Sequence, residues 1–215
     1  MDRPLIVEVH IIVESNEWIK TISKISEILK KCNKEDYNLI PLYANYDIED
    51  TEVRICLQIK DPVKLEKFIV EKIRKIKGVY ATRVRLTLNG EIFPKGIEVL
   101  TEMREGFYSC HIFINTMAGK DEEVWRCLRE LKENNNVFPV WIFRDFYEYD
   151  HDITLRLIGK NDKSIREYVE NHIANIDGIK TWRLKFMYNV IQILGREGLL
   201  KIAKNWFNLQ RIKKG

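Results

Sequence analysis

Apolar and polar residues alternate along four stretches of the first half of the chain, and this period of two predicts β-strands. The predicted strands are residues 5–13, 37–46, 51–60 and 79–88. Two other stretches carry apolar residues every three or four positions, which predicts helices over 16–32 and 61–78. Asp61 and Pro62 suit the N-cap and first position of the second helix, and Gly78 suits its end. The predicted order is strand–helix–strand–strand–helix–strand.

The second half repeats this order. Its predicted strands are residues 107–115, 138–148, 151–159 and 179–190, and its predicted helices are 119–134 and 162–178. Residues 73–90 align without a gap with 173–190, with identities that include Gly78/Gly178 and Arg83/Arg183. In the first strand His10 aligns with His111, at a spacing of 101 residues.

This order is the ferredoxin-like βαββαβ pattern. We therefore expect an α+β protein made of two tandem ferredoxin-like units that arose by duplication. Two helices cover one face of each sheet, so we expect the units to shield each other's second face as an intramolecular dimeric α/β-barrel-like pair. The predicted boundaries are 1–90 for the first unit, 91–105 for a linker with a short helix, 106–194 for the second unit, and 195–215 for a basic amphipathic C-terminal helix. This last helix is expected to pack on its own body or on a sister subunit.

Strand alternation sorts the side chains by sheet face. The face away from the helices is predicted to collect Glu8, His10, Arg54, Cys56, Gln58, Arg83, Arg85 and Thr87 in the first unit, and Ser109, His111, Phe113, Thr154, Arg156, Arg183, Lys185 and Met187 in the second. These charges are either solvated or cross-paired with Glu8 and Glu52, or several guanidinium groups converge on a pocket for anions. A metal or haem role for His10 and His111 competes with a structural, hydrogen-bonded one.

Charge and composition narrow the classes of function. The chain of 215 residues has a net charge of +4. Residues 195–215 carry six basic residues and one acidic residue, so the rest of the chain is close to −1, a poor footprint for nucleic acid. The four cysteines form no C-x-x-C pair, and neither a signal peptide nor a membrane span is predicted, which favours a cytoplasmic location. Abundant Ile, Lys and Glu with five Pro are typical of a heat-adapted, archaeal protein.

The second half resembles the effector-binding domain of the Lrp/AsnC family of transcription regulators. Residues 118–131 (AGKDEEVWRCLREL) resemble the family's first helix, and 147–187 resemble its turn, strand, helix and last strand. The first half matches through 61–88. The resemblance implies a barrel of two units, oligomerisation, and sensing of an amino acid or a similar molecule. The family's N-terminal helix-turn-helix is missing, so direct DNA binding is not expected. Tyr147 replaces the family's turn glycine, ahead of Tyr149 and Asp150.

The leading hypothesis is a non-enzymatic regulatory or sensor protein that binds a small molecule, such as an amino acid or other anion, or a partner protein. Its expected ligand-binding residues are Tyr149, Asp150, His10, His111, Arg83 and Arg183. For Tyr149 and Asp150, a structural turn is an equally good explanation. We expect no catalytic residue, metal or cofactor, no membrane contact, and assembly with itself or with another regulator. The alternatives are an α/β-barrel monooxygenase or haem-handling enzyme, or an ACT-like amino-acid-binding module.

Overall fold

The computed structural model describes residues 5–32, 37–47, 51–102, 107–146 and 151–191. In the first half the elements are β1 (Leu5–Val13), α1 (Trp18–Cys32), β2 (Ile40–Asp47), β3 (Glu52–Ile59), α2 (Pro62–Phe68), the π-helical turn η1 (Ile69–Ile73) and β4 (Val79–Ile92). After α3 (Pro94–Thr101) come β5 (Tyr108–Thr116), α4 (Asp121–Arg129), β6 (Val137–Phe146), β7 (Ile153–Gly159), α5 (Asp162–His172) and β8 (Ile179–Ile191). The predicted order of strands and helices is confirmed in both halves.

The described residues divide into two compact units. Unit 1 contains the chain up to Thr87 together with Tyr188–Ile191, and unit 2 contains Leu88–Met187. In unit 1 the antiparallel strands are ordered β4-β1-β3-β2, and β2 also pairs with the end of β8. In unit 2 the order is β8-β5-β7-β6. The long strands β4 and β8 therefore each begin in one unit and end in the other.

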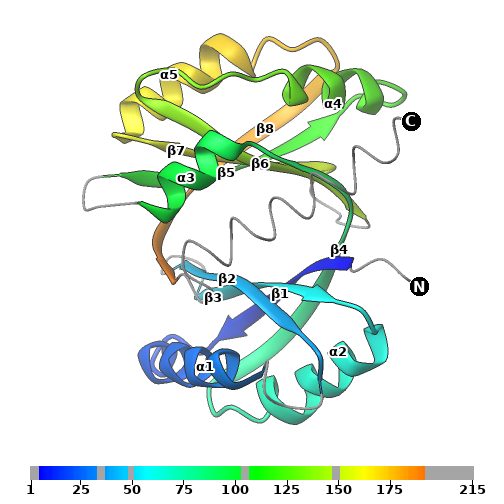
Figure 1. The fold of residues 1–215 in the computed structure, drawn as a ribbon, viewed down its shortest axis with the longest axis vertical. Coiled ribbons are helices and arrows are strands. Elements are labelled where there is room, and N and C mark those ends of the chain that lie inside the picture. Colours follow the sequence, from blue (N-terminus) through cyan, green and yellow to red (C-terminus); the bar gives the residue numbers. More distant parts are fainter. Residues whose placement is uncertain (1–4, 33–36, 48–50, 103–106, 147–150, 192–215) are drawn as a thin grey trace. The chain divides into compact units, whose positions relative to one another are not determined.

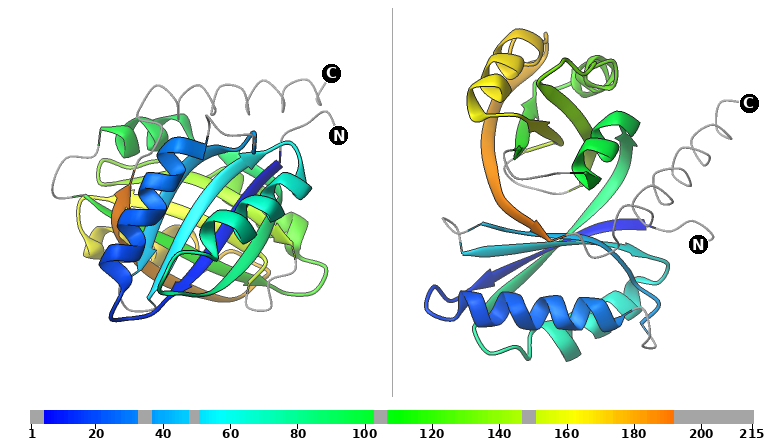
Figure 2. Two further views of the ribbon diagram at one scale, coloured as in Figure 1. Left: turned by 90° about the horizontal axis from the view of Figure 1, so that it is seen from below. Right: turned by 60° about the vertical axis from the view of Figure 1, so that its left-hand side comes forward.

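Each sheet has a helical layer on one face. In unit 1, α1 and α2 lie on the same side of the sheet, and in unit 2 α4 and α5 do so (Figures 1 and 2). Inward side chains of these helices, such as Ile25 and Leu29 in α1, pack on alternate strand residues such as Val9 and Ile55. The predicted sorting of strand residues between the two faces is confirmed by the strand pairing.

The start of α2 is set by its sequence, as predicted. The Asp61 carboxylate accepts a hydrogen bond from Val63 N at 2.9 Å, and Pro62 occupies the first helical position, where its missing N–H has no cost. The helix then widens into η1 before it ends ahead of Gly78, which has a φ of +89°. The short linker helix was predicted over residues 97–104, whereas α3 begins at Pro94, which again takes a first helical position.

The register contradicts the predicted equivalence of His10 and His111. His10 pairs with Arg54 and Arg83, whereas His111 pairs with Arg156 and Lys185. Since β3 and β4 align with β7 and β8 at a spacing of 100 residues, His111 occupies the position of Glu8, and His10 occupies that of Phe113. Equivalent residues of β1 and β5 are thus 103 positions apart, and not 101 as predicted. The face is unchanged, because a shift of two residues preserves the alternation.

Gly96 allows α3 to approach the backbone of β6. A Cβ at this position would overlap the carbonyl group of Pro139 and lie 2.8 Å from Val140 Cα. Backbone atoms of a hydrogen-bonded strand cannot move away cheaply, so Gly96→Ala should destabilise the protein by about 2–4 kcal/mol despite the better helix propensity of alanine. Urea unfolding would measure this. Gly119→Ala separates backbone strain from atomic overlap, because Gly119 has a φ of +79° but no atom lies within 4 Å of a Cβ there, so its cost of about 1–2 kcal/mol comes from the left-handed backbone alone. Equal stabilities of the Gly96→Ala variant and the wild type would contradict this packing.

Among the described residues, none of the helices combines the length and the apolar composition needed to cross a bilayer.

Candidate functional site

A buried ion network lies on the face of the unit 1 sheet opposite the helices. It consists of Glu8, His10, Glu52, Arg54 and Arg85, which come from β1, β3 and β4. Glu52 Oε1 lies 2.8 Å from His10 Nδ1, and its Oε2 lies 2.7 Å from Arg54 Nη2. Glu8 Oε2 lies 3.5 Å from His10 Nε2 and 3.3 Å from Arg85 Nη1. Positive and negative groups thus alternate along the network.

This arrangement changes the acidity of its members. Burial, the largest single effect, lowers the pKa of His10, but the hydrogen bonds and charges of Glu52 and Glu8 together outweigh it and raise that pKa to about 9. Burial likewise raises the pKa of Glu52, but His10 and Arg54 bring it down to about 2. At neutral pH His10 is therefore an imidazolium held between two carboxylates.

The shifted pKa of His10 makes the stability depend on pH. Because the pKa rises from 6.5 to about 9 on folding, the protonated ring stabilises the fold fully below pH 6.5, and this contribution is lost as the pH rises through 9. The expected loss is on the order of 3 kcal/mol. Unfolding in urea at pH 6, 7.5 and 9 should show the decline. His10→Gln should remove most of the slope and the exposed His172→Gln should not; equal slopes in all three proteins would contradict the assignment.

The corresponding face of unit 2 carries a different set of side chains, which we call the basic–aromatic cluster: His111, Phe113, Trp141, Arg156 and Lys185. The Arg156 guanidinium stacks on the Trp141 ring, with its carbon 4.4 Å from the ring centroid. Its Nε donates to Ser109 Oγ at 2.9 Å. His111 is fully buried, edge-on to Phe113 and Trp141 with centroids 6.0 and 6.4 Å away. The aromatic rings hold two basic groups in fixed orientations.

Strand pairing explains why these groups meet. Trp141 pairs with Arg156, Arg156 with His111, and His111 with Lys185, so one row crosses β6, β7, β5 and β8. Cross-strand neighbours on one face lie about 5 Å apart. Burial lowers the pKa of Lys185 to about 8, so its amine is partly neutral near physiological pH.

A second row lies beside the first and contains Phe143, Thr154, Phe113 and Arg183. The Arg183 guanidinium carbon lies 5.1 Å from the Phe113 centroid. The buried His151 ring lies on another side of Phe113, 4.5 Å away, and its Nε2 shares a hydrogen bond with Thr154 Oγ1 at 3.1 Å. Phe113 is therefore flanked by two basic side chains.

The six predicted ligand-binding residues do not form one site. His10 belongs to the ion network and His111 to the basic–aromatic cluster. Arg83 and Arg183 are exposed on β4 and β8. Tyr149 and Asp150 lie outside the described residues. The ligand-binding role of all six residues stays a prediction.

The sheet faces themselves settle one alternative. Simple solvation is wrong for most of the charged residues, because the side chains of Glu8, Arg54, Arg85 and Arg156 are buried. Cross-pairing with Glu8 and Glu52, the other part of that expectation, is confirmed in unit 1.

Two residues of the second unit were missed in the sequence. Trp141 escaped because a bulge between Pro139 and Trp141 shifts the alternation of β6 by one residue, which a strict period of two cannot anticipate. His151 follows directly on residues 147–150, and no sequence pattern marks it. For both residues the only signal in the sequence was the kind of side chain: Trp141 and His151 carry an aromatic and an imidazole ring close to a predicted strand.

The fold is similar to that of several solved structures of enzymes. A proposed monooxygenase from Lactobacillus acidophilus NCFM has 10% sequence identity and a TM-score of 0.57, with 89% of this chain and 97% of that chain covered. An anthrone oxidase-like protein has 9% identity and a TM-score of 0.55, with 89% and 94% covered. Chlorite dismutase from Candidatus Nitrospira defluvii, in complex with imidazole, has 8% identity and a TM-score of 0.51, with 93% and 94% covered. No protein-family model matches the chain, and no curated protein matches it significantly in sequence.

These similarities correct the prediction of function. The structures that share the fold are a proposed monooxygenase, a chlorite dismutase and an anthrone oxidase-like protein, and not Lrp/AsnC effector domains. The predicted resemblance to that family, the role in transcription regulation and the non-enzymatic sensor are therefore wrong. The resemblance failed because helix and strand patterns of ferredoxin-like units recur in unrelated proteins. The chain has an α+β fold of ferredoxin-like units that it shares with these solved structures.

Proposed function

We propose that the chain is an oxidising enzyme whose active site is the basic–aromatic cluster, and that its substrate is a planar aromatic molecule with an acidic hydroxyl group. The stacking of Arg156 on Trp141, in one row with His111 and Lys185, carries this proposal. Aromatic rings bind a flat substrate by stacking, and basic groups beside them stabilise an oxyanion. The similarity of fold to a proposed monooxygenase and an anthrone oxidase-like protein supports the same class of reaction.

The residues then have distinct roles. The neutral amine of Lys185 takes the proton of the substrate hydroxyl, and the Arg156 guanidinium stabilises the aryl oxide that results. This anion is electron-rich and reacts with dioxygen. In the overall reaction an activated ring CH₂ group and O₂ give a ring carbonyl and water, so atoms and electrons balance without another reductant. Trp141 and Phe113 orient the ring.

Haem, the other part of the predicted enzyme class, does not fit His10 or His111, the two histidines for which a haem role was considered. His10 is protonated at neutral pH and engaged with two carboxylates, so it lacks the free nitrogen lone pair that an iron ligand needs. Aromatic rings already flank His111, where a porphyrin would have to lie. No step is therefore assigned to haem.

Oxygen consumption tests the proposal directly. The purified protein would be mixed with hydroxylated anthrones, which carry both a phenolic hydroxyl and a ring CH₂ group, in an oxygen electrode, while absorbance follows the carbonyl product. We expect oxygen uptake and quenching of tryptophan fluorescence by these compounds, and no oxygen uptake with simple phenols, which lack the CH₂ group. No uptake above the buffer rate, together with no quenching, would overturn the proposal.

The pH dependence of the rate should identify the base. Because the neutral amine of Lys185 is the active form, kcat/KM should rise as the pH increases through about 8 and level off above it. Lys185→Met should abolish this rise and lower the rate at pH 9 by about 100-fold or more. The midpoint should be the same for substrates whose hydroxyl groups differ in acidity. A midpoint that follows the substrate would show that the protein group is not responsible.

The proposal also retains the finer expectations about the fold. Origin by tandem duplication is supported by the repeated element order and by the identities between residues 73–90 and 173–190. Pairing of the two units as an intramolecular α/β-barrel-like pair, the boundaries 1–90, 91–105, 106–194 and 195–215, and assembly into a homo-oligomer stay predictions.

A further inference from the structure

The helical layers of the two units differ in charge. Helices α1 and α2 with η1 carry seven lysines and three glutamates, a net charge of +4. Helices α4 and α5 carry four arginines or lysines and six acidic residues, a net charge of −2. The near-neutral charge of the chain outside residues 195–215 therefore conceals a basic layer on unit 1.

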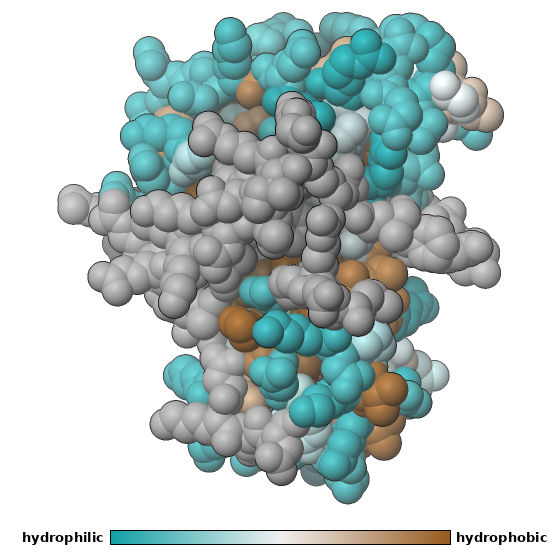
Figure 3. Space-filling view, turned by 45° about the vertical axis from the view of Figure 1, so that its right-hand side comes forward, coloured by the Kyte–Doolittle hydropathy of each residue, from teal (hydrophilic) through white to brown (hydrophobic). Residues whose placement is uncertain are grey.

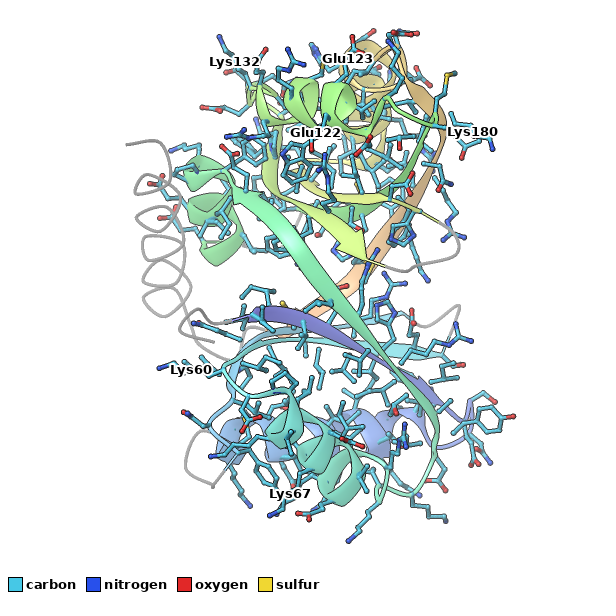
Figure 4. The ribbon with its side chains drawn as sticks, turned by 90° about the vertical axis from the view of Figure 1, so that its right-hand side faces the viewer. Lys60, Lys67, Glu122, Glu123, Lys132 and Lys180 are labelled. Carbon is cyan, nitrogen blue, oxygen red and sulfur yellow. The ribbon has the colours of Figure 1, made fainter. Side chains whose placement is uncertain are left out.

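The exposed side of α2 combines this charge with apolar side chains. The outer face of α2 and η1, which we call the α2 face, consists of Lys60 just before α2, Val63 and Lys67 in α2, Val70 in η1, and Arg74 just after η1. From Val63 onward these residues are spaced by three or four positions, so they form one stripe along the helix. Val63 is 71% exposed and Val70 is 44% exposed. Lys60 and Lys67 extend outward from unit 1 in Figure 4.

The neighbouring helix α1 also exposes lysines together with an apolar side chain. Ile19 is 65% exposed near the start of the helix, and Lys20, Lys24 and Lys30 are exposed along its length. The ion pairs that Lys20 and Lys24 form with Glu17 and Glu27 lie on the surface and are weak. Figure 3 shows hydrophobic side chains among hydrophilic ones on the visible surface of unit 1.

We propose that the α2 face, together with the outer side of α1, binds the surface of an anionic lipid bilayer. Lysines attract acidic headgroups, each one near the surface contributing about a fivefold factor in affinity. Their long stems let the charge remain at headgroup level while Ile19, Val63 and Val70 enter the boundary with the acyl chains. Nucleic acid is a poorer match, because exposed valine and isoleucine contact neither phosphates nor bases, and no aromatic side chain lies on the stripe. This attachment is to the surface only and is independent of the proposed oxidation chemistry.

Flotation with vesicles tests the proposal. The wild-type protein should bind vesicles of equal parts phosphatidylcholine and phosphatidylglycerol at physiological ionic strength, and should not bind phosphatidylcholine alone. Lys60→Glu/Lys67→Glu should reduce the bound fraction by about tenfold or more. The matched control is Lys132→Glu/Lys180→Glu, which makes the same charge change at exposed lysines of unit 2 (Figure 4) and should stay within about twofold of the wild type. Both variants keep residues 195–215, and this basic segment therefore contributes equally to vesicle binding in the two proteins.

A second pair of substitutions separates a lipid surface from other polyanions. Val63→Ser/Val70→Ser should weaken vesicle binding about fivefold while leaving retention on immobilised heparin unchanged. Circular dichroism would confirm that each variant is folded. The proposal is overturned by absence of wild-type binding, by equal loss in the unit 2 control, by full binding of the Lys60→Glu/Lys67→Glu protein, or by valine variants that bind vesicles as the wild type does.

Discussion

Arg156→Met is expected to lower kcat/KM for the proposed oxidation by at least about 100-fold, which corresponds to about 2.7 kcal/mol of transition-state stabilisation. Methionine can keep the packing on Trp141, but it removes the positive charge and the hydrogen bond to Ser109. The free energy of unfolding should change by no more than about 2 kcal/mol, since an apolar side chain of similar length is tolerated at a buried site. Steady-state oxygen uptake and urea unfolding measure the two effects separately.

The controls for this prediction come from the same chain. Arg166→Met removes an exposed arginine of α5 that lies near Phe186, and it should leave kcat/KM unchanged. Arg156→Lys should not restore the rate, because an ammonium group reproduces neither the planar stacking nor the Nε hydrogen bond. If folded Arg156→Met protein oxidised its substrate at the wild-type rate, the arginine would have no part in the chemistry.

Glu8→Gln should destabilise the protein by about 3 kcal/mol, which is among the largest effects expected from one isosteric substitution. The change keeps the shape of the side chain but removes the carboxylate that Arg85 and His10 contact inside the sheet. Arg85 and His10 would each lose the charge of one carboxylate, while His10 keeps its contact with Glu52. Urea unfolding at pH 6, where His10 is protonated, gives the clearest measurement.

A double substitution distinguishes pairing from general damage. Glu8→Gln/Arg85→Met removes both members of the pair, so its loss of stability should be smaller than the sum of the losses in Glu8→Gln and Arg85→Met. Glu27→Gln, which breaks the exposed pair with Lys24, should cost less than about 0.5 kcal/mol. A Glu8→Gln effect as small as that of Glu27→Gln would show that the ion network does not stabilise unit 1.

Local patterns were sufficient for the elements and for their faces. The period-two alternation in residues 5–13 placed Glu8 and His10 on one side and Val7 and Val9 on the other, as the structure has them. Asp61 and Pro62 also marked the start of α2 correctly, because capping depends on residues next to each other in the chain.

The contents of the candidate site could not be predicted in this way. Cross-strand pairing joins Arg85 to Glu8, 77 residues apart, and His10 to Glu52, 42 residues apart. Only the register shows that His111 stands beside Arg156 and Lys185 while His10 stands beside Arg54. A bulge in β6 then brings Trp141 onto the same face. The register leaves no trace in the spacing of apolar residues, because a shift of two positions preserves the pattern, and a strict period of two does not anticipate the bulge.

The sequence by itself determined two βαββαβ units, the start of α2 and the sheet face of the residues predicted in β1, β3, β4, β5, β7 and β8, because these depend on interactions among near neighbours in the chain. The tertiary structure alone decided that the charged faces are buried, that unit 1 pairs its arginines with carboxylates, and that unit 2 holds its basic groups against aromatic rings. The physical reason is that burial and ion pairing depend on strand register and packing between segments that lie far apart in the sequence.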